Sequence, residues 1–314
     1  METIAPGVHQ LDTLLGGWER MTAGFLIDGP EPALVETGSQ SSVPAVRAAL
    51  ESAGVGADQL RWLVLTHIHL DHAGGIGDLA AAFPKATVVV HERGAHHLVD
   101  PTRLIDSSAR VYGPLLDGLY GRITPVPEER LVAAADNHRI ELGNGRVLRL
   151  VDSPGHARHH HAVLDESSGT LLVGDAVGVL LPDIGLLRPA APPPEFNLED
   201  AVASLHRFAA IGAERVVLTH YGPVPGDGQA TLAEAEEVLR SWVAVAERAV
   251  ADSADAGVEG IARALADAFL TPPEQLDADA RERLEILNGV HSNAAGIARY
   301  LAKRSPGPAV DAPA

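Results

Sequence analysis

The pattern of apolar and polar positions predicts a chain that passes repeatedly between short strands and helices. Residues 7–37 contain short apolar runs separated by Gly and Pro, which is typical of antiparallel strands. Apolar runs predict further buried strands at 61–66, 87–91, 146–151, 162–164, 171–173 and 215–218. Apolar residues at helical spacing predict helices over 42–53, 76–83 and 197–211, the last with Asn197 as N-cap.

After Pro225 the pattern changes to helices alone. Helical spacing predicts helices at about 230–251, 256–269, 272–288 and 291–303. We therefore divide the chain into a first domain at 1–227 and a C-terminal helical module at 228–304. The Pro- and Gly-containing residues 305–314 are expected to be a disordered tail. Within the first domain, residues 93–135 lack strand patterning, and we interpret them as a helical insertion.

Composition narrows the possible partners. Hydrophobic residues make up 46% of the 314 and aromatics only 4%, so Ala, Val and Leu must fill the core. The formal net charge of −18 disfavours nucleic acid and anionic membranes as partners. No apolar run approaches the roughly 20 residues that a membrane helix needs. With no leader-like N-terminus and no membrane-length apolar run, we expect a cytoplasmic protein that acts on a small-molecule substrate, and the absence of cysteine excludes disulfides without fixing the compartment.

The most informative motif lies at residues 66–75, Thr-His-Ile-His-Leu-Asp-His-Ala-Gly-Gly. Its His67, His69, Asp71 and His72 offer the nitrogen and oxygen donors that zinc prefers. The motif leaves a predicted strand and enters a predicted helix. Residues two apart on an extended segment point the same way, so His67 and His69 can bind one ion. Asp71 and His72, beyond the bend, reach a neighbouring position. A purely structural role is disfavoured, because so many polar groups near a core are costly to hold together.

Three further donors follow predicted strands. His156 comes after the strand 146–151 and a Pro-Gly turn, Asp175 after 171–173, and His220 after 215–218. Alone, each is unremarkable: a Gly-Asp pair is often a turn, and a single histidine is often a core residue. Their shared position at strand exits favours a common role as metal ligands.

With these motifs the chain resembles the metallo-β-lactamase-fold hydrolase superfamily. The likeness is greatest to the dinuclear branch of glyoxalase II and related thioesterases, lactonases and phosphodiesterases. It covers roughly residues 5–225. It implies an αββα four-layer sandwich, two mixed β-sheets flanked by helices, with residues 1–227 as the catalytic domain. The absence of cysteine argues against β-lactam hydrolysis, since the Cys-containing second site of zinc β-lactamases cannot form.

The resemblance also implies two divalent metal ions per chain. The first would be bound by His67, His69 and His156, and the second by Asp71, His72 and His220. Asp175 would bridge the two ions, with a hydroxide between them. Ligands without sulfur suit Zn, Fe or Mn, and we expect zinc. Metal binding lowers the pKa of water to about 7, so the hydroxide can attack a carbonyl or phosphoryl group.

Three residues are candidates for catalysis besides metal binding. His160 stands four residues after His156, the spacing of a supporting histidine in glyoxalase II-like chains, and we expect it to orient a ligand. His160 and Tyr221 are also candidate proton donors, and Asp71 is a candidate catalytic carboxylate.

Arg188 is a candidate substrate-binding residue. It is the single cation in residues 177–189, which are apolar and rich in Pro and Gly. Because this segment follows Asp175, we assign it to the pocket wall. Arg188 would then meet an anionic group of the substrate, and the alternative is an ordinary surface arginine.

The chemistry favours thioesters as substrates. A thiol has a pKa of about 8.5 and leaves as a thiolate, whereas an amide needs a proton donor. Lactones or activated esters come next, then phosphodiesters. A mononuclear dioxygenase is disfavoured by the full second ligand set, and a diiron flavoprotein by the lack of a flavin-like module. A non-enzymatic regulatory role stays open. By the resemblance the C-terminal helices would recognise the substrate, and alternatively they form a homodimer interface.

Overall fold

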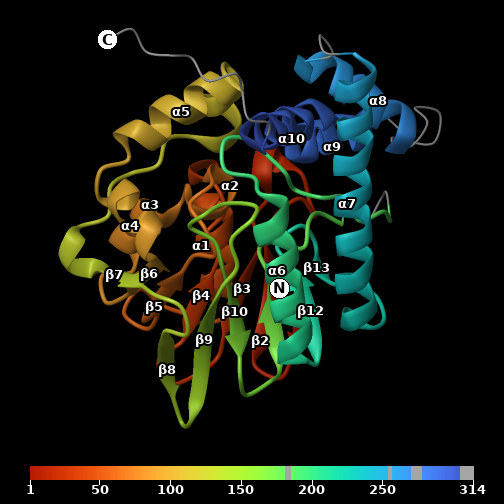
Figure 1. Cartoon of the computed structure of the whole chain (residues 1–314). Coiled ribbons are helices and arrows are strands. Elements are labelled where there is room, and N and C mark those ends of the chain that lie inside the picture. Colours follow the sequence, from red (N-terminus) through yellow and green to blue (C-terminus); the bar gives the residue numbers. More distant parts are fainter. Residues whose placement is uncertain (181–184, 254–256, 270–277, 305–314) are drawn as a thin grey trace, which may run out of the picture.

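The computed structural model describes residues 1–180, 185–253, 257–269 and 278–304 (Figure 1). Within these ranges the strands form two mixed sheets. The first sheet follows chain order: β1 (Glu2–Ala5), β2 (Val8–Asp12), β3 (Ala23–Ile27), β4 (Ala33–Val35), β5 (Trp62–Val64), β6 (Thr87–His91) and β7 (Leu131–Ala134). The pairs from β1 to β4 are antiparallel, as predicted for residues 7–37, and those from β4 to β7 are parallel.

The second sheet reverses the chain order. Its strands are β13 (Gly222–Pro223), β12 (Arg215–Leu218), β11 (Thr170–Leu172), β10 (His161–Asp165), β9 (Arg146–Asp152) and β8 (Arg139–Gly143). β11 and β12 run parallel, and the other neighbours are antiparallel. The predicted strands at 146–151, 162–164, 171–173 and 215–218 all lie in this sheet.

Helices cover the outer faces of both sheets, which confirms the predicted αββα sandwich (Figure 1). α1 (Val43–Ser52), α3 (Ile76–Ala82) and α4 (Glu92–Val99) pack on the first sheet, and α6 (Leu198–Ile211) and α7 (Gly228–Asp252) on the second. Strand β6 shows why its sequence is apolar throughout. Val89 faces the core between the sheets, while Val88 and Val90 face the helices, so both sides are buried.

The C-terminal helices are α8 (Gly257–Phe269), α9 (Ala278–Asn288) and α10 (Val290–Arg304). They match the predicted helices at 256–269 and 291–303 and the described part of 272–288. Their hydrophobic core includes Phe196 and Val202, so it extends across the proposed boundary at residue 227, and that division stays a prediction. The predicted tail at 305–314 lies outside the described residues. In the described part of the chain, no helix has the length and apolar content that crossing a membrane requires.

The predicted helical insertion at 93–135 ends too late. It contains most of α4, then α5 (Thr102–Tyr112) and a π-helical turn at Leu116–Tyr120, but Leu131–Ala134 form strand β7. In the described part of the chain this strand pairs in parallel with β6 and forms the edge of the first sheet. A four-residue apolar run has no helical or strand period of its own, so pairing with β6 decides its conformation.

Candidate metal centre

The His67–His72 segment forms the turn that the sequence predicted. Strand β5 ends at Val64, His67 and His69 follow on extended chain, and the short helix α2 (Leu70–Ala73) begins directly after His69. Asp71 and His72 lie on this helix. The side chains of His67 and His72 are fully buried, so their ring nitrogens must find partners inside the protein.

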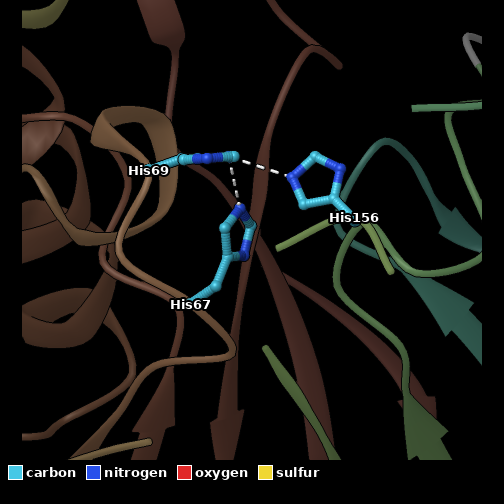
Figure 2. Close-up of side chains that lie close together, drawn as sticks. All are labelled: His67, His69 and His156. Atoms are coloured by element: carbon cyan, nitrogen blue, oxygen red, sulfur yellow. Dashed lines mark hydrogen bonds between the residues drawn. The ribbon is translucent and has the colours of Figure 1, made fainter. Parts of the chain in front are cut away.

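Three imidazoles converge in a first donor group (Figure 2). His67 Nε2 and His156 Nε2 each lie 2.9 Å from His69 Nδ1. Nitrogen ligands of a tetrahedral zinc ion lie about 3.4 Å apart, so a small adjustment would accommodate a cation. Burial lowers the pKa of all three histidines, and the neighbouring imidazoles lower those of His67 and His69 further. Neutral rings of this kind offer the lone pairs that a metal requires.

A second donor group lies beside the first. His72 Nε2 and His220 Nε2 are 3.2 Å apart, and Asp71 Oδ2 lies 3.6 Å from the former and 3.5 Å from the latter. His220 reaches this position from the segment that follows β12, in the other sheet. Two imidazoles and a carboxylate again form a donor set typical of zinc, iron or manganese.

Asp175 lies between the two groups. Its Oδ1 is 3.2 Å from the Nε2 atoms of both His72 and His220, and its Oδ2 is 3.5 Å from His156 Nε2. Oδ1 is buried and has no hydrogen-bond partner in the described part of the chain. A buried carboxylate oxygen without a partner is costly, and a cation would satisfy it. The structure thus brings together all seven predicted ligands.

Hydrogen bonds on the outer ring nitrogens set the histidine tautomers. Each Nδ1–H donates to a protein oxygen: His72 to Glu36 Oε2 at 2.7 Å, His220 to Met21 O at 2.8 Å, and His156 to Ala190 O at 2.9 Å. A carbonyl or carboxylate oxygen can only accept, so the ring proton must be on Nδ1. When the ring is neutral, each Nε2 therefore presents its lone pair to the donor groups, as in metal-bound histidines.

The charges of the second group are strongly interdependent. Burial disfavours protonated His72 and His220, but the carboxylates of Asp175 and Asp71 together outweigh it and raise the pKa of both, with Glu36 adding to the effect at His72. Conversely, burial would raise the pKa of Asp175, yet His72 and His220 hold it well below its usual range. In the metal-free protein, protons on these histidines therefore supply the positive charge that Asp175 requires.

Glu36 contacts the second donor group, and the sequence reasoning missed it. It is fully buried, its Oε1 accepts a hydrogen bond from Thr66 N–H at 2.9 Å, and its Oε2 holds His72. Its φ of 67° is uncommon for a residue with a side chain. A signal was present: Glu36 follows the apolar run 33–35, at a strand exit like those of the ligands.

The side chain of His160 contacts the backbone of Asp175. The Asp175 N–H donates to His160 Nε2 at 3.2 Å, and His160 Nδ1 bonds Ser153 Oγ at 2.8 Å. Gly174 makes this approach possible: its φ is 52°, and a Cβ there would lie 2.5 Å from His160 Nε2. Both ring nitrogens of His160 are thus engaged, and the ring holds the backbone of Asp175, while a role in orienting a metal ligand stays a prediction.

The two remaining candidates lie outside the donor groups. The Tyr221 hydroxyl donates to Asp12 Oδ2 at 3.3 Å, and burial together with Asp12 raises its pKa to about 12. Arg188 is only 4% exposed, so the surface alternative is wrong. Its backbone pairs with Val179 in an antiparallel bridge. Residues 181–184 of the predicted pocket wall lie outside the described residues.

Residues 17–220 match the Metallo-beta-lactamase superfamily, and the chain belongs to that superfamily. The match includes every predicted metal ligand and Glu36.

Similar proteins include the metallo-beta-lactamase fold-containing protein ST1585 of Sulfurisphaera tokodaii. It is 32% identical over 170 residues, 53% of this chain and 62% of its own length. A solved structure of ST1585 superposes with a TM-score of 0.68 at 23% identity, covering 93% of this chain and 98% of that one.

Two other relatives have activities in their names. A hydroxyacylglutathione hydrolase of Acidiphilium cryptum is 31% identical over 54% of this chain and 54% of its own. An atrochrysone carboxyl ACP thioesterase of Aspergillus fumigatus is 26% identical over 46% of this chain and 26% of its own. The matched part of the chain therefore spans between about a quarter and two thirds of the length of these curated relatives.

Proposed function

We propose that the chain is a hydrolase that uses two divalent metal ions, most naturally zinc, to cleave thioesters. One observation carries the two-ion part: the two oxygens of Asp175 face separate donor groups. A single cation at the first donor group would leave the second group, Asp71, His72 and His220, without a role, although its donor atoms lie only 3.2–3.6 Å apart. Bound metal ions supply an activated water and polarise the carbonyl oxygen of the substrate.

The protein's own residues would contribute orientation and charge. Glu36 and the Ala190 carbonyl fix the rings of His72 and His156, and His160 fixes the backbone of Asp175. Asp71 is the candidate catalytic carboxylate, since its Oδ2 lies at the second donor group and the residue retains 9% exposure. A carboxylate in this position can accept a proton from water.

The substrate class follows from the leaving group. Of the two candidate proton donors, His160 uses both ring nitrogens, and the Tyr221 hydroxyl bonds Asp12. A substrate whose leaving group departs without being protonated is therefore favoured. A thiolate can leave in this way, because the pKa of a thiol is only about 8.5. The thioesterase among the relatives supports this choice.

Matched esters test this proposal. Metal-loaded protein should hydrolyse a thioester faster than the oxygen ester with the same acyl group, and faster than a lactone or a phosphodiester. Asp71→Asn should abolish most of the activity, whereas Asp58→Asn, at an exposed ion pair with Lys85, should not. Preference for a phosphodiester would overturn the thioester assignment, and no hydrolysis of any substrate would favour a non-enzymatic role.

We also propose that Arg188 binds an anionic group of the substrate. Its Nη2 is buried without a hydrogen-bond partner among the described residues. Burial lowers the pKa of Arg188, and Glu285 opposes that shift. A guanidinium nevertheless stays protonated in proteins, so it presents an incompletely compensated charge. A carboxylate or phosphate oxygen would satisfy it.

S-acyl pantetheine and S-acyl phosphopantetheine, which differ by one phosphate, test the role of Arg188. Arg188→Gln should raise KM for the phosphorylated thioester about tenfold or more and leave the neutral one unchanged. A thioester of 3-mercaptopropionate, which carries a carboxylate in place of the phosphate, tests in the same way whether Arg188 binds a carboxylate group. Equal losses on charged and neutral thioesters would contradict the assignment.

A further inference from the structure

The ring of His156 is held by a backbone carbonyl that lies far away in the sequence. His156 Nδ1–H donates to Ala190 O at 2.9 Å. We call residues 189–191 the Ala190 strap. Because this hydrogen bond fixes both the ring orientation and the tautomer of His156, the position of the strap determines where Nε2 points.

Two buried asparagines of the C-terminal helices hold the strap on either side of Ala190. Asn288, the last residue of α9, donates from Nδ2 to Pro189 O at 3.0 Å. Asn293, in the first turn of α10, accepts at Oδ1 from Ala191 N–H at 2.7 Å. The exposed fractions of the two side chains are only 5% and 2%. Buried amides of this kind are normally fully bonded, and here their partners are the strap.

The two asparagines also bond each other. Asn293 Nδ2 lies 3.3 Å from both Asn288 Oδ1 and Gly289 O, which fixes the direction of its amide. One turn further along α10, a Cβ on Gly296 would lie 1.9 Å from Ala191 O. The helix therefore rests directly on the strap, and the connected network leaves the Ala190 carbonyl little freedom.

We propose that Asn288 and Asn293 are positioning residues of the metal centre, and that α9 and α10 are part of its ligand support. They act through the Ala190 strap on His156 and so on the first donor group. The inference rests on the metal centre of the proposed function, and it is independent of the substrate.

The consequence is specific to one donor group. His72 and His220 take their orienting bonds from Glu36 and Met21, and among the described residues neither asparagine shares a hydrogen bond with these two. Loss of an outer partner of a metal-bound histidine typically lowers metal affinity about 10–100-fold. Removal of Asn293 should therefore weaken the first metal and spare the second.

Stepwise titration of the full-length, metal-free protein with Co²⁺ or Zn²⁺ against a competing chelator tests this inference. His156→Gln identifies the step that belongs to the first donor group. Asn293→Ala should lower the affinity of that step about 10–100-fold and leave the other step unchanged.

Tyr300→Phe is the matched control. It removes a 2.8 Å hydrogen bond from Tyr300 in α10 to Glu199 in α6, and it leaves the strap untouched. Both variants should lower the thermal stability of the metal-free protein, but only Asn293→Ala should lose first-site affinity.

Several outcomes would overturn the inference. If Asn293→Ala binds both metal ions with wild-type affinity, the helices only stabilise the fold. The same conclusion would follow if Asn293→Ala and Tyr300→Phe both lost metal affinity equally at the two binding steps. If Asn293→Ala does not fold, Asn288→Ala removes the bond to Pro189 O and must give the same selective loss. Failure of the wild-type protein to bind any metal would instead refute the proposed function.

Discussion

Glu36 gives a sharp test of how the metal centre is organised. Replacing it with Gln keeps the shape of the side chain but removes one acceptor. Its two oxygens accept from Thr66 N–H at 2.9 Å and from His72 Nδ1–H at 2.7 Å. Whichever way the new amide is turned, its NH₂ group meets one of these two donors. Either a buried donor stays unsatisfied or His72 moves its proton to Nε2, where it blocks metal binding.

The expected cost follows from this mismatch. An unsatisfied buried donor costs about 1–3 kcal/mol, which corresponds to about 5–150-fold in metal affinity at the His72 position. Chelator-competition titration measures the affinity, and nitrogen-15 NMR of the imidazoles reports the tautomer. Glu166→Gln, which removes a surface ion pair with Arg139, serves as the control. Unchanged affinity at both metal positions in Glu36→Gln would refute the role given to Glu36.

Three other predictions address the rest of the centre. Asp175→Ala should lower occupancy at both metal positions, because its oxygens face different donor groups; elemental analysis that still finds about two equivalents per chain would refute the bridging role. Gly174→Ala should lower the melting temperature more than Gly185→Ala, because both have positive φ but only Gly174 would bring a Cβ against His160; equal losses would contradict this. Metal affinity should rise with pH and level off above the raised pKa values of His72 and His220, because bound protons must leave. Calorimetry in buffers of different ionisation enthalpy should detect their release, and its absence would contradict this prediction.

The seven residues of the two donor groups were predictable because their signals are local. A short apolar run followed by His or Asp marks a strand exit, and this pattern can be read without knowing how the strands pair. The Asn197 cap is equally local: its side chain accepts from Asp200 N–H, three residues away. Such features need no knowledge of which elements are neighbours.

The supporting residues were harder to predict because their partners are distant in sequence. Glu36 meets His72 across 36 positions, and Asn293 meets Ala191 across 102. The burial of Arg188 depends on the same kind of contact, since its partner Val179 packs against Leu284 of α9. Such contacts are set by tertiary packing, which residue patterns along the chain do not specify.

We propose that seven side chains, from segments of both sheets, hold two cations. An anomalous-difference map of metal-loaded crystals, recorded at the absorption edge of the metal, tests it most directly. Two peaks are expected, one among His67, His69 and His156 and the other among Asp71, His72 and His220, with Asp175 between them. A single peak, or peaks away from these residues, would contradict the claim.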